Sequence, residues 1–166
     1  MKKLILLAIL AGLAWWYFDH GRRITEADVR ASYEADMDAT RRFDGDFLCA
    51  RISDDFAGSE VSRQDGEDFE EHFDKAGQCK RIKRSIEAMQ QLSVATGGRI
   101  SLKIDYEIKN IEFSPDRKRA TVQTVSTAKL GDMTLARDRT TDHLIRRNGR
   151  ILSIASEARV WTYTPQ

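Results

Sequence analysis

The sequence predicts an α+β fold, in which an N-terminal helix is followed by two or three helices packed on a curved antiparallel β-meander. Two features lead to this prediction. From Arg99 to Tyr163 four strand-like runs follow one another, and in the first of them, RISLKIDYEI, apolar and polar residues alternate. That period of two is typical of a half-buried strand. Before Arg99, apolar residues recur every three or four positions, which is typical of amphipathic helices.

Turn signals at 114–118, 131–132 and 148–149 divide the four predicted strands. The last of them, Asn-Gly, is the strongest, because a two-residue type I′ turn needs positive φ at both positions. This turn places residues whose numbers sum to 297 opposite each other. The predicted pairs are therefore Thr140 with Glu157 and Asp138 with Arg159. One β-bulge would reverse the face to which these side chains point.

Length and charge exclude some classes of protein. At 166 residues the chain has room for one domain and an appendage, and 41% hydrophobic residues suffice for a folded core. A net charge of +1 argues against a globally basic nucleic-acid binder. Residues 26–74 carry 16 acidic and 5 basic residues, whereas residues 75–87 and 99–159 are net basic. The two halves either neutralise each other within one domain or present two faces to partners.

The N-terminal segment contains 15 uncharged residues, Leu4–Phe18, directly after two lysines. We expect residues 1–23 to be an uncleaved signal anchor that holds the protein in a bacterial inner membrane, with the domain in the periplasm. Trp15, Trp16 and Tyr17 are typical of an interfacial aromatic belt. The run is shorter than the roughly 20 residues that normally span a bilayer, and snorkelling of flanking basic side chains would extend it.

Two alternatives for this segment stay open: a cleaved signal peptide that leaves the protein secreted into the periplasm, and a buried core helix. Cleavage after Gly12-Leu13-Ala14 would leave a short apolar region and would place two tryptophans directly after the cut, which is unfavourable.

Three helices are predicted before the sheet. Thr25 and Asp28 form a near capping box at the start of the first, and the apolar stripe begins with Val29. A short second helix is expected over 46–52, and residues 57–66 are expected to form a loop with room for one short strand. The third helix is predicted from Glu67 to about Leu92, because apolar residues recur there at helical spacing.

Two segments carry a resemblance to a known family: Ser53-Asp54-Asp55-Phe56 after the second helix, and the terminal hairpin LIRRNGRILSIASEARVW. With the order of elements, they make residues 24–166 resemble the nuclear transport factor 2-like (cystatin-like α+β cone) superfamily. That superfamily includes ketosteroid isomerase-like and dehydratase-like enzymes, small-ligand binders and non-catalytic assembly domains, so the resemblance implies a fold and leaves function open. One inner-membrane assembly component of type IV secretion systems combines a single membrane helix with this fold.

The chain has two cysteines, Cys49 and Cys79, on neighbouring predicted helices. In an exported domain they would form one disulfide. The alternative is two buried thiols, since free cysteine packs like a small apolar residue. Two cysteines without histidines at ligand spacing do not make a metal site, and we expect no metal and no cofactor.

The sheet offers a candidate ligand pocket in which Tyr106, Arg139 and His143 would hold an anion or polarise a carbonyl. The alternative is a solvated face with ordinary cross-strand pairs. For an isomerase-type enzyme, Tyr33, Asp36 and Asp105 are further acid–base candidates. Asp36 lies next to the core stripe of an acidic helix, and Asp105 alternates away from the apolar face of its strand.

A basic run in the third helix supplies a candidate partner surface, formed by Lys80, Arg81, Lys83 and Arg84. The alternative is a solvated helix face that offsets the acidic first half of the domain. The run lacks the interleaved aromatic residues that a single-strand nucleic-acid binder needs.

Two functions are consistent with these features. The first is a membrane-anchored envelope module without catalytic activity, whose partner is another envelope protein or a second copy. The second is a small-ligand binder or ketosteroid isomerase-like enzyme that uses the cavity between helices and sheet. Several convergent polar groups in that cavity would favour the second, and continuous aliphatic packing would favour the first.

Overall fold

The computed structural model describes residues 2–64, 67–97 and 102–163, and the structural statements below concern these residues. The start of the predicted meander, Arg99 and Ile100, lies outside them. The helices are α1 (Lys2–Asp19), the short 3₁₀ helix η1 (His20–Arg22), α2 (Glu26–Arg41), α3 (Gly45–Ala50) and α4 (Lys75–Ala95). The strands are β1 (Ile52–Gln64), β2 (Glu67–Asp74), β3 (Leu102–Phe113), β4 (Arg119–Leu130), β5 (Met133–Arg147) and β6 (Arg150–Thr162).

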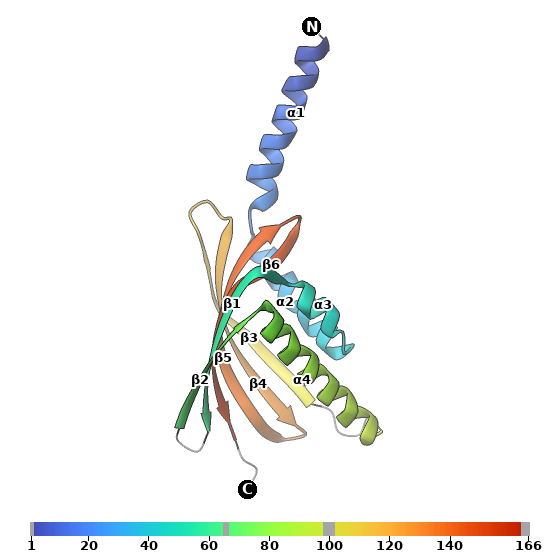
Figure 1. Cartoon of the computed structure of the whole chain (residues 1–166), viewed down its shortest axis with the longest axis vertical. Coiled ribbons are helices and arrows are strands. Elements are labelled where there is room, and N and C mark those ends of the chain that lie inside the picture. Colours follow the sequence, from blue (N-terminus) through green and yellow to red (C-terminus); the bar gives the residue numbers. More distant parts are fainter. Residues whose placement is uncertain (1, 65–66, 98–101, 164–166) are drawn as a thin grey trace.

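The α+β fold is confirmed: one sheet of six strands, in the order β2-β1-β6-β5-β4-β3, curves around α2, α3 and α4 (Figure 1). Strands β3 to β6 form the predicted antiparallel meander. Strand β1 pairs in parallel with β6 and antiparallel with β2. All three helices of the domain lie on the concave side of the sheet, so the space between the two layers is where a cavity can form.

The structure corrects the prediction for residues 52–74, which form two long strands, whereas the sequence indicated a loop with room for one short strand and the start of a helix. Phe69 and Phe73, four positions apart, fit a helical stripe but equally fit a strand with a period of two. Strand β1 is rich in small and polar residues, and hydrogen bonding to a strand on each side outweighs their weak strand propensity. Gly58 is required there, because a Cβ atom would lie 2.2 Å from Cε2 of Phe73.

The predicted start of the first domain helix is confirmed. Thr25 and Asp28 form a complete capping box at the N-terminus of α2, which satisfies two backbone amides that the helix leaves unpaired. Asp44 likewise caps α3, where its side chain accepts a hydrogen bond from the Phe47 amide at 2.9 Å. Helix α3 ends at Ala50, two residues before its predicted end, because β1 begins at Ile52.

The register of β5 with β6 is correct next to the Asn-Gly turn and wrong beyond it. Arg147 pairs with Arg150, as predicted, but an irregularity between His143 and Leu144 shifts the register by one residue for the part of β5 farther from the turn. Thr140 therefore lies opposite Ala158, and Asp138 lies opposite Val160. The predicted Thr140–Glu157 and Asp138–Arg159 pairs do not form.

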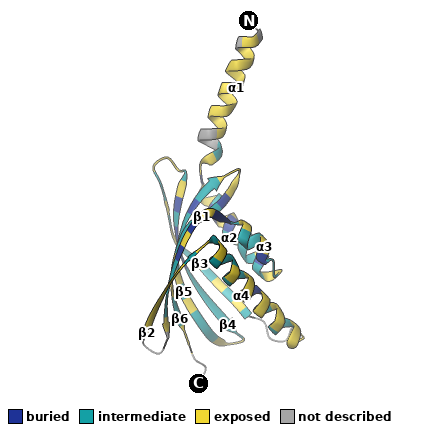
Figure 2. Cartoon of the chain, viewed as in Figure 1, coloured by how far each residue is buried: buried dark blue, intermediate teal, exposed yellow. Residues whose placement is uncertain are grey.

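The fully packed core lies at the end of the domain nearest α1. It consists of Ile24, Val29, Ala120, Val122, Leu144 and Ile151. The chain is fixed there before α2 begins, since the amide of Ile24 donates a hydrogen bond to the carbonyl of Arg117 at 2.7 Å. In Figure 2, dark blue buried segments occur in the part of the sheet nearest α1, whereas the far end of the sheet is mostly half-buried or exposed. Packing is therefore tight at one end and looser along the rest of the helix–sheet interface.

Helix α1 projects away from the domain, and its apolar side chains are exposed (Figure 2). The sequence led us to expect a membrane-spanning segment within residues 1–23. Residues 2–22 are helical, but in the described part of the chain no helix is both long enough and apolar enough to cross a membrane. The uncharged run stops after 15 residues, short of the roughly 20 that spanning requires.

Candidate functional site: a polar cavity between helices and sheet

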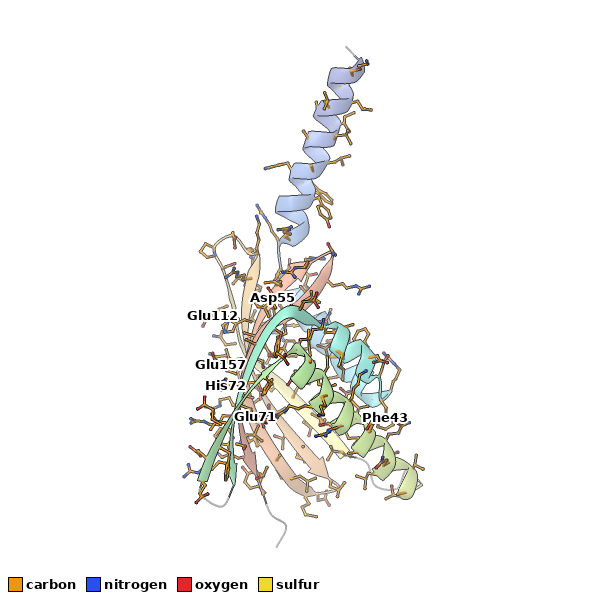
Figure 3. All side chains as sticks on the ribbon, viewed as in Figure 1. Phe43, Asp55, Glu71, His72, Glu112 and Glu157 are labelled. Atoms are coloured by element: carbon orange, nitrogen blue, oxygen red, sulfur yellow. The ribbon has the colours of Figure 1, made fainter. Side chains whose placement is uncertain are left out.

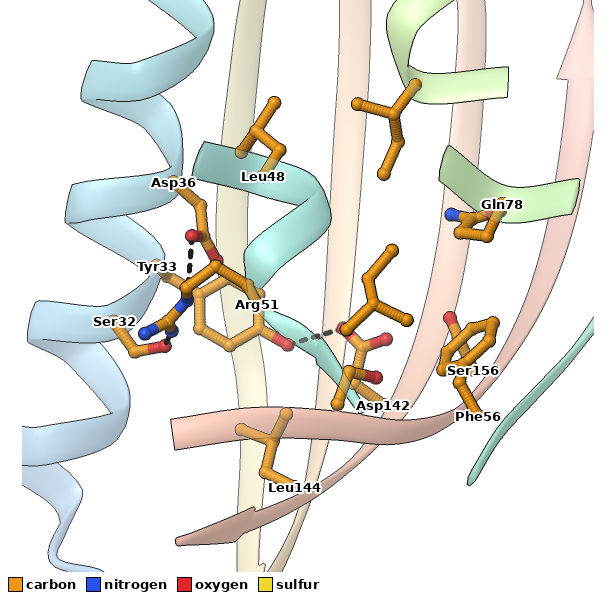
Figure 4. Close-up of a pocket in the computed structure, with 13 residues that line it drawn as sticks. Ser32, Tyr33, Asp36, Leu48, Arg51, Phe56, Gln78, Asp142, Leu144 and Ser156 are labelled. Carbon is orange, nitrogen blue, oxygen red and sulfur yellow. Dashed lines mark hydrogen bonds and ion pairs between the residues drawn. The ribbon is translucent and has the colours of Figure 1, made fainter. Parts of the chain in front are cut away.

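A cavity of about 260 Å³ lies between the helices and the concave face of the sheet (Figure 4). Its walls come from α2, α3, the start of β1, α4, β5 and β6. The lining residues are Ser32, Tyr33, Asp36, Leu48, Arg51, Ile52, Phe56, Gln78, Ile82, Asp142, Leu144, Ser153 and Ser156. Several polar groups from different elements thus converge on one small space.

A hydrogen bond between Tyr33 and Asp142 forms the floor of the cavity. The Tyr33 hydroxyl, from α2, donates to Oδ2 of Asp142, from β5, at 2.5 Å. Asp142 keeps some accessible surface toward the cavity but is otherwise surrounded by protein, and this burial raises the pKa of its carboxyl. Hydrogen bonds from Tyr33 and Ser156 act in the opposite direction. Burial and the nearby carboxylate also raise the pKa of Tyr33, so its proton stays on the phenol.

A second carboxyl, Asp36, lies one turn beyond Tyr33 on α2. Its Oδ1 is 3.1 Å from Nε of Arg51, and the geometry is that of an ion pair rather than an aligned hydrogen bond. Arg51 follows α3 and also donates to the hydroxyl of Ser32. Burial raises the pKa of Asp36 to about 6, although the charge of Arg51 opposes that shift. Asp36 therefore changes its protonation state close to neutral pH.

The opposite wall of the cavity is mostly apolar. Leu48, Phe56 and Ile82 supply this surface, together with one amide, that of Gln78. The Oε1 atom of Gln78 is buried and has no hydrogen-bond partner within the described residues. A buried amide oxygen without a partner is unfavourable, so this atom is a place where a ligand donor would be stabilised.

The cavity continues along the helix–sheet interface. A second space of about 490 Å³ shares Leu48, Gln78, Ile82, Asp142 and Ser156 with the first. Its sheet side is polar: Asp138 accepts a hydrogen bond from Thr140 at 2.9 Å and another from Ser126. A third space of about 350 Å³, near Met37 and Phe43, shares Thr40, Met89 and Ile104 with the second.

The predicted ligand pocket of Tyr106, Arg139 and His143 does not form. Tyr106 lies on the helix side of the sheet, where its ring stacks on Tyr33 with 6.0 Å between centroids. His143 bonds Thr121 at 3.2 Å through Nδ1. Because side chains alternate along a strand and Asp142 faces the helices, Arg139 and His143 point to the other face. The three predicted residues are therefore divided between the two faces of the sheet.

Two of the acid–base candidates, Tyr33 and Asp36, do line the cavity. Asp105 does not reach it: its side chain is 69% exposed and lies 3.4 Å from Lys129. The sequence analysis missed Arg51, Gln78, Asp142 and Ser156. One available signal was that Asp142 shares its strand face with the apolar Leu144, which is buried in the structure.

Cys49 and Cys79 are both free and half-buried, on α3 and α4. They are neighbours, since Cys79 is among the groups that raise the pKa of the Cys49 thiol. A bond between them stays a prediction. Within the part of the chain that the structure describes, no group of histidine, cysteine, aspartate and glutamate side chains has the arrangement of a metal site.

The basic run on α4 faces acidic residues of the first half of the domain. Arg81 contacts Glu60 and Glu71, each at 2.5 Å, and its guanidinium lies over the ring of Phe73. Glu71 is labelled on β2 in Figure 3. Lys83 pairs with Asp46 at 2.6 Å. Lys80 and Arg84 are exposed. Half of the candidate partner surface is thus engaged within the domain, and its role toward a partner is untested.

No protein-family model matches the chain, and no curated protein matches it. Solved structures do. An NTF2-like protein of unknown function from Pseudomonas putida is 17% identical, with 81% of this chain and 84% of that chain covered and a TM-score of 0.54. The chain therefore has an NTF2-like fold.

Two further structures agree with this fold. A domain of unknown function with a cystatin-like fold from Nostoc punctiforme is 14% identical, covers 82% of this chain and 78% of that chain, and has a TM-score of 0.54. An NTF2-like protein from Cytophaga hutchinsonii is 15% identical, covers 82% and 98%, and has a TM-score of 0.52. At these identities the similarity concerns the fold alone and leaves the activity open.

Proposed function

We propose that the cavity binds a small organic molecule whose carbonyl or hydroxyl oxygen accepts a hydrogen bond from the Tyr33–Asp142 pair. The observation that carries this proposal is the hydrogen bond from Tyr33 to a carboxyl that burial drives toward its neutral form. Tyr33 gives its only proton to Asp142 and so holds the carboxyl in place, while a neutral carboxyl has a proton of its own to donate. A donor fixed in a partly apolar cavity stabilises an oxygen with negative character. The unpartnered amide oxygen of Gln78 would accept a donor from the same ligand.

The charges and the volume of the cavity narrow the ligand class. Asp36 and Arg51 offset each other, and burial raises the pKa of Asp142, which disfavours a negative charge on its carboxyl. An uncharged ligand fits this environment better than an anion or a cation. The part of the cavity next to the Tyr33–Asp142 pair has a volume of about 260 Å³, slightly smaller than the roughly 300–1,000 Å³ typical of drug-sized ligands, which suits a compact ring compound at this end.

The convergence of polar groups favours ligand binding over the non-catalytic assembly module that the sequence suggested first. Continuous aliphatic packing would have favoured that module, but eight of the lining residues have hydroxyl, carboxyl, amide or guanidinium side chains that come from both layers: Ser32, Tyr33, Asp36, Arg51, Gln78, Asp142, Ser153 and Ser156.

The test is a titration with 4-fluorophenol followed by fluorine NMR. We expect saturable binding to the wild-type chain, at least tenfold weaker binding to Tyr33→Phe and Asp142→Leu, and unchanged binding to Tyr106→Phe. The last variant is the matched control, since Tyr106 stacks on Tyr33 but lies outside the set of residues that line the cavity. Thermal unfolding of each variant checks that it folds. Equal binding to wild type and Tyr33→Phe would contradict the proposal.

A second candidate function, proton transfer next to a carbonyl, is favoured by the pKa of about 6 for Asp36. A carboxylate with such a pKa is a stronger base than an ordinary aspartate and is ionised at neutral pH. Asp36 would remove a proton from the carbon next to the carbonyl while the Tyr33–Asp142 pair stabilises the resulting enolate. Deuterium incorporation into cyclohexanone in heavy water measures this step by NMR, and Asp36→Asn should abolish the protein-dependent rate. A rate that Asp36→Asn leaves unchanged would exclude the role.

We also propose that α1 attaches the domain to a lipid bilayer. Ile5, Leu6, Leu7 and Leu10 are each at least 55% exposed, and three of them are consecutive, so the apolar surface runs around the helix rather than along one stripe. Lysines at positions 2 and 3 would meet anionic headgroups. Lipid covers such a helix on all sides, which one groove of a protein partner cannot do.

Flotation with vesicles of phosphatidylcholine and phosphatidylglycerol tests the attachment. The full chain should float with the vesicles, and Leu6→Glu with Leu10→Glu should remain at the bottom of the gradient. The control is Ser62→Glu, a change on β1 remote from α1. Oligomers held together by α1 without affinity for vesicles would overturn the lipid assignment.

A further inference from the structure

The two cysteines lie where the backbones of α3 and α4 come close together. A Cβ atom placed on Gly45, at the start of α3, would lie 3.7 Å from the Cα of Lys83 on α4. One turn further along α3 is Cys49, and one turn back along α4 is Cys79. The two helices therefore run antiparallel with Gly45 facing Lys83 and Cys49 facing Cys79, and the ion pair of Asp46 with Lys83 at 2.6 Å holds the first contact.

This arrangement favours a disulfide. A disulfide joins residues whose Cα atoms are roughly 4.4–6.8 Å apart and whose side chains point toward each other. The absence of a side chain at Gly45 lets the helices approach closely, and Cys79 is near enough to the Cys49 thiol to raise its pKa.

Both cysteines are next to residues of the cavity wall. Leu48 precedes Cys49 and lines the cavity, and Gln78 precedes Cys79 and lines it too. Arg51, which pairs with Asp36, follows Cys49 by two positions. A covalent bond at this point would fix the two helices that carry these three groups relative to each other.

We propose that Cys49 and Cys79 are a redox site that forms a reversible disulfide with a thiol–disulfide oxidant, locking α3 to α4 at the wall of the cavity. One cysteine thiolate attacks a sulfur of the oxidant disulfide and releases the first oxidant thiol. The other cysteine then attacks the mixed disulfide and releases the second. Two protons leave the protein, its two thiols are oxidised, and the oxidant disulfide is reduced to two thiols.

Burial raises the pKa of Cys49 to about 12. At neutral pH very little thiolate is therefore present, and thiolate is the reactive form. Oxidation should consequently be slow in air and should need an exchange partner. The half-buried position of both thiols agrees with slow oxidation, since neither is freely exposed to oxidants in solution.

The experiment uses the full chain, reduced and then incubated with oxidised glutathione. Intact mass should fall by two hydrogen atoms, and a maleimide applied after unfolding should label neither cysteine. Oxidation should raise the midpoint of thermal unfolding, and Cys49→Ser and Cys79→Ser should each abolish that rise. Two labelled thiols, or a persistent single glutathione adduct on the wild-type chain, would overturn the proposal.

The effect on ligand exchange rests on the proposed function and is measured separately. The dissociation rate of 4-fluorophenol, taken from fluorine line widths, should be several-fold lower in the oxidised protein and unchanged by the oxidant in Cys79→Ser. If 4-fluorophenol binds neither form, the proposed function fails while the mass and melting data still decide the disulfide. An intact disulfide with neither a higher melting midpoint nor slower ligand exchange would show that the bond does not lock the helices.

Discussion

The two faces of β5 carry similar numbers of charged groups in different surroundings. Asp138 and Asp142 point toward the helices, where each has hydrogen-bond partners from other elements. Arg139 and His143 alternate with them and point to the other face, where Arg139 is exposed. On the helix side, burial shifts the pKa of Asp142, whereas the outer side chains remain near solvent. The surroundings of a side chain, more than its type, therefore decide which face can hold a ligand.

The largest contrast between the faces should appear in packing. Leu144→Ala, on the inner face, should lower the free energy of unfolding by about 2–5 kcal/mol, because Leu144 is 5% exposed and its removal leaves a cavity in the core. The neighbouring change on the outer face, His143→Ala, should cost less than about 1 kcal/mol. Urea unfolding measures both. Equal losses would mean that the assigned faces are wrong.

The next contrast concerns hydrogen bonding. Tyr33→Phe removes the donor to Asp142 and should cost about 1–3 kcal/mol, because a buried carboxyl then lacks a partner. Tyr106→Phe keeps the ring that stacks on Tyr33 and should cost clearly less. Thermal and urea unfolding of the two variants give the difference. A larger loss for Tyr106→Phe would show that stacking, not the Tyr33–Asp142 bond, organises this wall.

A smaller effect should appear as a pH dependence. The pKa of Asp36 is about 6 in the folded protein, compared with 3.8 for an aspartate without the surrounding structure. The folded state therefore holds this proton more tightly than the unfolded chain. The contribution of Asp36 to stability is therefore present below pH 3.8 and is lost as pH rises through about 6. The loss should be on the order of 1 kcal/mol, since the side chain is one-third exposed. The free energy of unfolding, measured at several pH values, should depend on pH with different slopes for wild type and Asp36→Asn between pH 4 and 6. Parallel pH dependences would contradict the assignment.

The smallest effect is expected on the outer face. Arg139→Ala should change stability by no more than about 0.5 kcal/mol, because exposed side chains contribute little. Binding of 4-fluorophenol should also stay unchanged. A loss of binding in Arg139→Ala would indicate that the outer face, not the inner one, holds the ligand.

The sequence predicted the meander well because each of its signals is local. Alternation in β3 and the Asn-Gly turn between β5 and β6 act over a few residues, and the structure contains both. The strands β1 and β2 were not predicted at their full length, because their stability depends on pairing with other segments and a local residue pattern does not indicate such pairing.

For the site, Tyr33 and Asp36 could be nominated because their helix was correctly placed. Asp142 was missed because the prediction placed the ligand on the face of Arg139 and His143, although Asp142 shares its strand face with the apolar Leu144. Arg51 and Gln78 belong to segments whose helix boundaries were predicted wrongly, since α3 ends at Ala50 and α4 begins at Lys75. The cavity residues that they face also lie far away in sequence. A prediction based on local periodicity cannot assemble a cavity from six separate elements.

The parallel pairing of β1 with β6 also bears on how the protein folds. It joins positions about one hundred residues apart, such as Ile52 and Ser153, whereas every pair within the meander is connected by a short turn. Closing so long a loop costs more chain entropy than closing a hairpin, and folds that depend on such contacts form slowly. We therefore expect the meander to form before β1 adds to its edge. Because Ile52 and Phe56 belong to β1, the cavity is completed only in that last step, and a chain truncated or trapped before it would have a sheet without a binding site.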